Sequence, residues 1–139
     1  MILTFHLLKK WLPELNSRRY TAEDFYSIVN RKECDVVEMH LKRKGYYVTN
    51  GKEDYIFLKN RLRELAWLQA AFHEMIHLLM HVPCKFLKRR HEREAQVFAL
   101  IAMFPEHELP QLVLEYDTFD PFTQFLIRKR LKVLQRYGL

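Results

Sequence analysis

His73, Glu74 and His77 form a His-Glu-x-x-His motif in a stretch whose composition favours a helix. Because a helix advances about 100° per residue, the two histidines lie about 40° apart on one face, where both imidazoles can bind the same ion. In zinc peptidases with this motif, the glutamate holds and deprotonates the metal-bound water. Zinc lowers the pKa of that water from about 16 to about 7, so the motif predicts hydrolysis at neutral pH.

The alternative for this motif is structural, with His73 and His77 as polar side chains on a partly buried helix. In a chain of this length and composition, the motif arises by chance with a probability of roughly 0.03. We therefore favour a metal site over a coincidence of spacing.

A catalytic zinc needs three protein ligands and one open position, so a third ligand must be found. The metzincin pattern is excluded, because the sixth residue after His77 is Pro83 instead of histidine. His81 follows His77 by four residues but lies about 80° around the helix from His73. We expect His81 to support a ligand or to pack in the core.

The remaining candidates for the third ligand are His91, Glu92 and Glu94, at the start of the next helical stretch. On a helical wheel, three alanines lie within about 80° of Glu92, namely Ala95, Ala99 and Ala102. Another helix can approach such a stripe closely, so we predict that Glu92 faces the two histidines. Glu94, about 160° away, would face solvent or a neighbour. The alternative is that these glutamates bind no ion and are solvated in the first turn of the helix, where the helix dipole favours acidic residues.

Peptide hydrolysis also needs a donor that stabilises the oxyanion, and His91, His107 and Tyr116 are candidates between which the sequence does not choose. The segment 55–58 is a candidate edge strand to which an extended substrate could add. An ordinary core strand is the alternative for this segment.

The rest of the chain must position these residues, and its pattern predicts an α+β fold. We expect a short N-terminal helix ending near Pro13, a helix over 21–32 that Thr21 and Asp24 cap, and strands over 35–41, 45–49 and 54–58. Asn50-Gly51 lies between the last two strands and favours a tight turn. We predict a small antiparallel sheet of about three strands.

Three further helices are expected, over 61–81, 92–104 and 120–137, and Pro83 and Pro105 end the first two. The chain is then a single zinc metallopeptidase domain over 1–139. Its parts are N-terminal helices at about 1–33, the sheet at about 35–59, catalytic helices at about 61–104 and C-terminal helices at about 106–138.

Composition is consistent with one folded domain, since 49% of the 139 residues are hydrophobic and only three are glycine. A net charge of +6 attracts anions but is too small to assign a nucleic-acid partner.

Cys34 and Cys84 form no C-x-x-C pair, which fits a reducing cytosol. The N-terminal apolar run has the features of neither a signal peptide nor a membrane span, so we expect a cytoplasmic protein without a membrane partner.

The motifs together resemble the ImmA/IrrE metallopeptidases. HEMIHLLMH at 73–81 matches their HExxH helix, and EREAQVFA at 92–99 with Met103-Phe104-Pro105 matches a downstream ExxAxxFA in a helix that ends at proline. The resemblance covers roughly residues 21–105 and is looser in the C-terminal helix. It departs from the family pattern at Met75-Ile76, which replace a usual small pair, and at Gln96, where Asn or Asp is common.

The resemblance implies a gluzincin-like site in which His73, His77 and Glu92 bind Zn²⁺ and Glu74 is the general base. It also implies a protein substrate, namely a helix-turn-helix transcriptional repressor.

Two other functions are weighed against the peptidase. One is a catalytically weak or inactive ImmA/IrrE-like module that binds a regulator without cleaving it. The other is nucleic-acid binding through the basic residues of the last helix, Arg128, Lys129, Arg130, Lys132 and Arg136. Because apolar residues alternate with these basic ones as in a helix packed on one side, we expect no direct nucleic-acid binding. The oligomeric state is left open.

Overall fold

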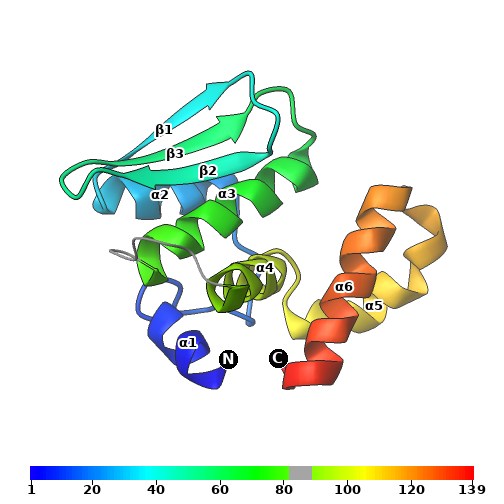
Figure 1. Ribbon diagram of the computed structural model, residues 1–139. Coiled ribbons are helices and arrows are strands. Elements are labelled where there is room, and N and C mark those ends of the chain that lie inside the picture. The colour runs from blue at the N-terminus through cyan, green and yellow to red at the C-terminus, as the bar shows by residue number, and fades with distance from the viewer. Residues whose placement is uncertain (82–88) are drawn as a thin grey trace.

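A computed structural model describes residues 1–81 and 89–139 and confirms the predicted α+β class (Figure 1). The helices of this part are α1 (Ile2–Leu8), α2 (Ala22–Arg31), α3 (Glu64–Met80), α4 (Arg89–Met103), α5 (Leu109–Leu114) and α6 (Pro121–Tyr137), and the strands are β1 (Cys34–Met39), β2 (Gly45–Thr49) and β3 (Asp54–Lys59). Pro83, expected to end a helix, and Cys84 lie outside the described residues.

The sheet has three strands in the order β1-β3-β2, and helices α2 and α3 cover one of its faces (Figure 1). The buried side chains of β3 are Ile56 and Leu58, which point toward these helices. On the opposite face the rings of Tyr55 and Phe57 stack with their centroids 6.1 Å apart. The sheet therefore contributes one apolar layer to the core and leaves its other face more open.

The prediction of a wholly antiparallel sheet is wrong. Strand β2 pairs antiparallel with β3, but β1 pairs parallel with β3. Of the two interpretations of the segment 55–58, the core strand is confirmed and the edge strand is excluded, because β3 lies in the centre of the sheet. Since Ile56 and Leu58 are fully buried, the most buried strand takes the position in which both of its edges are hydrogen-bonded. On the side of β2, the outer edge of the sheet has no further strand among the described residues, and β2 contacts α3.

A capping box begins α2, as the sequence indicates. The Thr21 side chain accepts from the backbone N–H of Asp24, and the Asp24 carboxylate accepts from the backbone N–H of Thr21 at 2.7 Å. The Asp24 carboxylate also receives two hydrogen bonds from Arg18 at 3.0 and 3.1 Å. These bonds fix the start of the helix that buries Phe25, Ile28 and Val29 against the sheet and α3.

Helices α3 and α4 pack against each other. Three alanines on α4 are fully buried, namely Ala95, Ala99 and Ala102. On a helical wheel they share the face of α4 that carries Glu92, and Glu92 lies against His73 and His77 on α3. The predicted alanine stripe is therefore a buried face of α4, and small side chains on such a face allow another helix to approach closely.

A buried guanidinium joins α6 to the end of α4. Arg130 is fully buried and donates to the Phe104 carbonyl at 2.6 Å, to the Asn16 side-chain oxygen at 3.0 Å and to the Leu139 carbonyl at 2.7 Å. Burial lowers the pKa of Arg130 to about 10, so the group stays charged at neutral pH. These three hydrogen bonds hold α6 beside the end of α4.

The observed helix ends differ slightly from the predicted ones. The helix expected from residue 61 begins at Glu64, because Arg61 takes a positive φ of 61° that a right-handed helix does not allow. The N-terminal helix ends at Leu8 and is followed by turns up to Pro13. Among the described residues no single helix is both long and apolar enough to cross a membrane. One pair of helices meets these criteria when taken together, but it is bent by 59°; the pair is Arg89–Met103 with Glu106–Leu114.

Asp24→Asn is expected to lower the free energy of unfolding at pH 7 by about 0.5–1 kcal/mol, because it weakens the capping box and the half-exposed bond to Arg18. The hydrogen bonds from Arg18 lower the pKa of Asp24 in the folded protein. The stabilisation is therefore present above the unfolded pKa, about 3.9, and is lost as pH falls through the folded pKa.

Urea denaturation of both proteins between pH 7 and pH 3 measures this effect. The difference between them should narrow below about pH 4. Glu23→Gln, at an exposed position in the same first turn, is the matched control and should show a smaller difference at pH 7. A difference that is constant across this pH range contradicts the proposed role of the Asp24 charge.

Candidate metal centre

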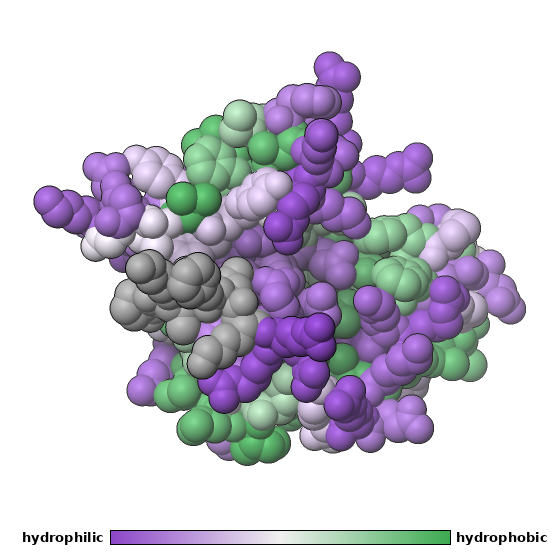
Figure 2. Space-filling model, viewed as in Figure 1, coloured by the Kyte–Doolittle hydropathy of each residue, from purple (hydrophilic) through white to green (hydrophobic). Residues whose placement is uncertain are grey.

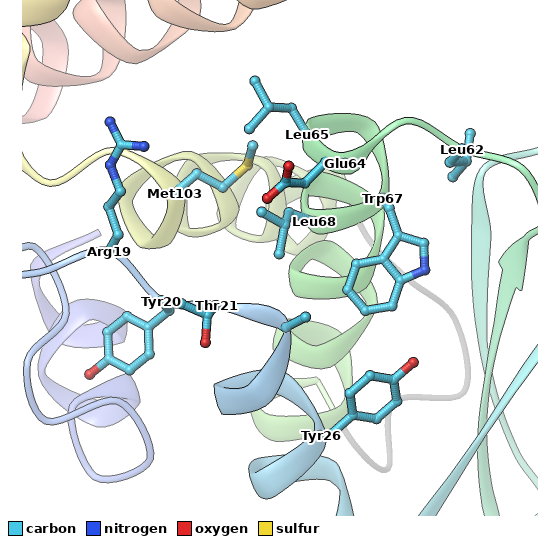
Figure 3. A pocket seen from close by; sticks show the side chains of 11 residues that line it. Arg19, Tyr20, Thr21, Tyr26, Leu62, Glu64, Leu65, Trp67, Leu68 and Met103 are labelled. Atoms are coloured by element: carbon cyan, nitrogen blue, oxygen red, sulfur yellow. The ribbon is translucent and has the colours of Figure 1, made fainter.

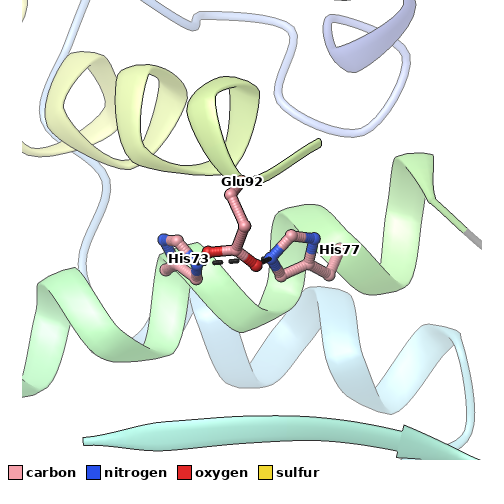
Figure 4. Close-up of side chains that lie close together, drawn as sticks. All are labelled: His73, His77 and Glu92. Carbon is pink, nitrogen blue, oxygen red and sulfur yellow. Dashed lines mark hydrogen bonds and ion pairs between the residues drawn. The ribbon is translucent and has the colours of Figure 1, made fainter. Parts of the chain in front are cut away.

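The side chains of His73, His77 and Glu92 converge, as the wheel predicts (Figure 4). Both histidines lie on α3, and Glu92 reaches down from the first described turns of α4 between them. Each residue offers one ligand atom, and these atoms lie within 4.8 Å of one another. The three residues could therefore hold a metal ion.

The distances between the donor atoms suit a small ion. Nε2 of His73 lies 3.1 Å from Oε2 of Glu92, Nε2 of His77 lies 2.9 Å from Oε1 of Glu92, and the two Nε2 atoms are 3.2 Å apart. Ligands at about 2.05 Å from a tetrahedral ion are about 3.3 Å from one another. The measured distances, which involve both oxygens of Glu92, are therefore close to the spacing between ligands of one small ion.

Burial keeps both histidines in the neutral form that a metal ligand requires. Loss of solvent lowers the pKa of His73, although the Glu92 carboxylate opposes this effect. Burial, followed by repulsion from His73, lowers the pKa of His77 to about 4. At neutral pH both imidazoles therefore have a lone pair available for an ion.

Glu74 follows the first histidine and is buried beside strand β2, with 8% of its surface exposed. Burial, and then repulsion from Glu92, raises the pKa of Glu74 to about 7, while Arg43 and a backbone hydrogen bond from Tyr47 oppose the rise. A carboxyl group with this pKa can both accept and donate a proton at neutral pH, as a general acid–base group must.

Gly45 allows the first residue of β2 to lie against Glu74. A Cβ at this position would meet Cγ of Glu74 at 3.1 Å, the Phe57 carbonyl oxygen at 3.2 Å and a Leu58 methyl group at 3.3 Å. Any larger residue would press β2 away from α3 or push Glu74 from its place. The sequence analysis missed this role, because a strand glycine alone does not show what approaches it.

A pocket of about 260 Å³ opens over His73, Glu92 and Glu74, whereas His77 is fully buried and does not line it. Its other lining residues are Arg43, Lys44, Gly45, Gln69, Ala70 and Gln96. Arg43 acts electrostatically on both His73 and Glu74, and it is a group that sequence reasoning did not find. No sequence motif marks Arg43, since it enters the pocket only through the placement of β2.

His81 supports His77 from the side away from the ligand donors. Nδ1 of His77 lies 2.8 Å from Nδ1 of His81, so a hydrogen bond between them leaves Nε2 of His77 free for an ion. The His81 ring stacks on the ring of His91 with 4.2 Å between centroids and 18° between planes. Burial, and then repulsion from His91, lowers the pKa of His81 to about 4.

Glu94 faces α1 and not the metal donors. Its carboxylate accepts from the Thr4 hydroxyl at 2.5 Å and lies 3.9 Å from Nε2 of His81. Because Glu94 is only 8% exposed, the alternative of a solvated first turn is wrong for this residue. The expectation that Glu94 points away from Glu92, toward a neighbour, is confirmed.

Two of the three candidate oxyanion donors lie elsewhere. His107 is in the turn Glu106–Glu108, and Tyr116 is in the turn Tyr116–Thr118, where its hydroxyl accepts from Arg128. Neither lines the pocket over the metal donors, and His91 lies behind His81. The geometry supports an oxyanion role for none of the three, because the C-terminal helices carry the first two away from α3.

Another cavity, of about 410 Å³, lies between the starts of α2 and α3 and the end of α4 (Figure 3). Trp67, Tyr26 and Leu65 line it together with Arg19 and Glu64. No histidine or cysteine is among its described lining residues. This cavity is therefore separate from the group formed by His73, His77 and Glu92, which could hold a metal ion.

Comparison of the sequence with protein-family models and with curated proteins finds no match. The likeness to ImmA/IrrE peptidases thus depends on the motifs themselves, and the metal cluster depends on the observed convergence of three donors.

Glu92→Ala is expected to weaken zinc binding by on the order of a hundredfold, because it removes one of three donors. Competition with a chromophoric chelator at pH 7.5 measures the affinity. Glu23→Ala, an exposed glutamate away from the pocket, is the matched control and should bind zinc like the wild type. Equal zinc affinities for Glu92→Ala and the wild type would show that these donors do not form a metal site.

His81→Phe is expected to lower zinc affinity by about 10- to 100-fold, since it removes the hydrogen-bond partner of His77 but keeps an aromatic ring against His91. The same chelator competition gives the affinity, and circular dichroism shows whether the fold is retained. The control is His107→Phe at an exposed position. Unchanged affinity in a folded His81→Phe protein excludes the supporting role of His81.

Proposed function

We propose that the chain is a zinc-dependent endopeptidase that hydrolyses a peptide bond in a protein substrate, with Glu74 as the general base. The observation that carries this proposal is the convergence of three donors beside a buried carboxyl group with a pKa of about 7, at a pocket that His73, Glu74 and Glu92 line. Structural zinc sites have four protein ligands, whereas catalytic sites have three and an open position.

The donor set favours zinc over harder cations. Two imidazoles and one carboxylate are typical of catalytic zinc, whereas magnesium and calcium prefer oxygen ligands. When bound, zinc would polarise the scissile carbonyl and lower the pKa of a water molecule.

The residues of the chain have distinct roles in this proposal. Glu74 accepts a proton from the attacking water and returns it to the leaving amine, so no covalent intermediate forms. Arg43, whose charge acts on both His73 and Glu74, is the cationic group of the pocket placed to oppose negative charge on the tetrahedral intermediate. The hydrogen bond between His77 and His81 keeps the His77 ring in the orientation that the ion needs.

Strand β2 provides a surface on which an extended peptide can lie. The Lys59 N–H donates to the Lys44 carbonyl, and antiparallel pairing alternates, so Gly45, Tyr47 and Thr49 turn their backbone groups to the free edge. Tyr47 already donates to Glu74 along this edge. A substrate strand paired with Gly45 would thus pass Glu74, which supports a peptide as the substrate.

A helix-turn-helix repressor is the substrate that the resemblance to ImmA/IrrE peptidases supports, and we propose it on that basis. The alternative is a module that binds such a regulator without cutting it. Gln96 lines the pocket where that family commonly has Asn or Asp, and this difference supports the alternative. Retention of zinc after purification without a chelator favours the peptidase.

Glu74→Gln is expected to keep the fold and the zinc affinity but to lower the rate of cleavage by at least about a thousandfold, because the amide cannot accept the proton. Zinc-loaded wild-type and Glu74→Gln proteins would each be incubated with a proteome-derived peptide library and with the repressor encoded nearest to its gene. Mass spectrometry then counts new N-termini. Equal cleavage by the two proteins would exclude Glu74 as the base, and no cleavage by zinc-loaded wild type would favour the non-cleaving module.

A further inference from the structure

A groove of about 380 Å³ continues from the metal pocket between helices α4 and α6. Gln69 and Gln96 line both the pocket and the groove, so the two are continuous. Figure 2 shows hydrophilic side chains gathered on this face, between the sheet and α6. A peptide that reaches the metal donors along β2 can therefore extend into the groove without leaving the surface.

The charged residues that line the groove are all basic. They are Arg93 on α4 and Lys129, Lys132 and Arg136 on α6. All four are exposed, and none forms an ion pair with a carboxylate of residues 1–81 or 89–139. Four uncompensated positive charges around one groove attract an anionic ligand.

The basic residues of α6 divide between different environments. Lys129, Lys132 and Arg136 follow a spacing of three and four residues, which places them on one helix face toward the groove. Arg130 is buried in the core, and Arg128 donates to the Tyr116 hydroxyl. The positive charge available to a ligand is thus concentrated beside the metal pocket.

The floor of the groove is apolar. Val97 and Leu100 on α4 and Val133 on α6 line it with 3–7% of their surfaces exposed, and Tyr137 closes one end. A ligand that fills the groove must therefore combine negative charges for the walls with an apolar group for the floor. A peptide segment of acidic residues around one apolar side chain has this combination.

We propose that the groove between α4 and α6 binds an acidic segment of the substrate, in which carboxylates pair with Lys129, Lys132, Arg136 and Arg93 and one apolar side chain contacts Val97, Leu100 and Val133. This proposal rests on the proposed peptidase function, because it places the segment next to the scissile bond. A peptide fits better than a nucleic acid, since phosphates would gain nothing from the apolar floor and Tyr137 is the one aromatic residue among the described lining residues, which is too few for successive bases to stack.

The test measures binding without cleavage. Two 12-residue synthetic peptides with an uncharged fluorescent label would be titrated into zinc-loaded Glu74→Gln protein and followed by fluorescence anisotropy. One contains Glu-Leu-Glu-Glu, and the other contains Gln-Leu-Gln-Gln in the same alanine-rich sequence. We expect the acidic peptide to bind about tenfold more tightly at low salt, with a difference that shrinks as salt is added.

A double charge reversal, Lys129→Glu with Lys132→Glu, should remove this preference. The matched control reverses Lys10 and Lys52, two exposed lysines outside the groove and the metal pocket, and so changes the net charge equally. The control protein should keep the preference. Lys129→Gln with Lys132→Gln provides a second variant that adds no negative charge, and circular dichroism shows that each protein is folded.

Equal affinities for the two peptides, or a preference that the groove variant retains, would overturn the proposal. A 12-nucleotide single-stranded DNA added as competitor distinguishes the other anionic partner: if it binds more tightly than the acidic peptide and depends on the same lysines, the groove is a nucleic-acid site. Failure of the peptidase function gives a different result. If the protein cuts no substrate but still prefers the acidic peptide in a groove-dependent way, the binding site is supported and the peptidase function is excluded.

Discussion

The close approach of α4 to α3 is the constraint on which the rest of the structure depends. The two histidines are on α3 and Glu92 is on α4, so the donor distances of about 3 Å depend on how closely these helices pack. Ala95 and Ala99 are fully buried on α4, and a bulkier residue at either position would be expected to move the helix and withdraw the carboxylate from both imidazoles. The candidate metal centre is therefore a product of core packing as much as of the ligands.

A second close approach, of β2 to α3, gives Glu74 its properties. Gly45 lets the strand lie against the glutamate, and this contact buries the carboxyl group and raises its pKa. The same contact leaves the outer edge of β2 beside the pocket. One packing event thus produces a buried carboxyl group whose pKa is near neutral pH and places the edge of β2 beside it, the two features that the proposed peptidase function requires.

The helix-borne part of the site could be predicted from the sequence, because a fixed angle per residue converts spacing into direction. That is why the positions of His73, His77 and Glu92 and the outward turn of Glu94 follow from a wheel. The sheet order could not be predicted in this way, since pairing depends on how deeply Ile56 and Leu58 are buried by helices elsewhere in the chain. Arg43 was missed for the same reason, because its position depends on where a loop is placed. For His81 the sequence allowed either support of a ligand or a place in the core, and the hydrogen bond to His77 depends on side-chain rotamers.

Substitutions of the buried Arg130 and of the exposed basic residues of α6 should have different effects. Arg130 anchors α6 to the end of α4 through bonds on the inner side of the helix, while Lys129, Lys132 and Arg136 stand on the outer side and touch none of those acceptors. Substitutions on the outer side would alter the charge of the groove and leave the helix geometry intact. If the proposed function holds, related chains could change the ligand that they recognise without moving α6, because the groove and the anchoring bonds use different faces of this helix.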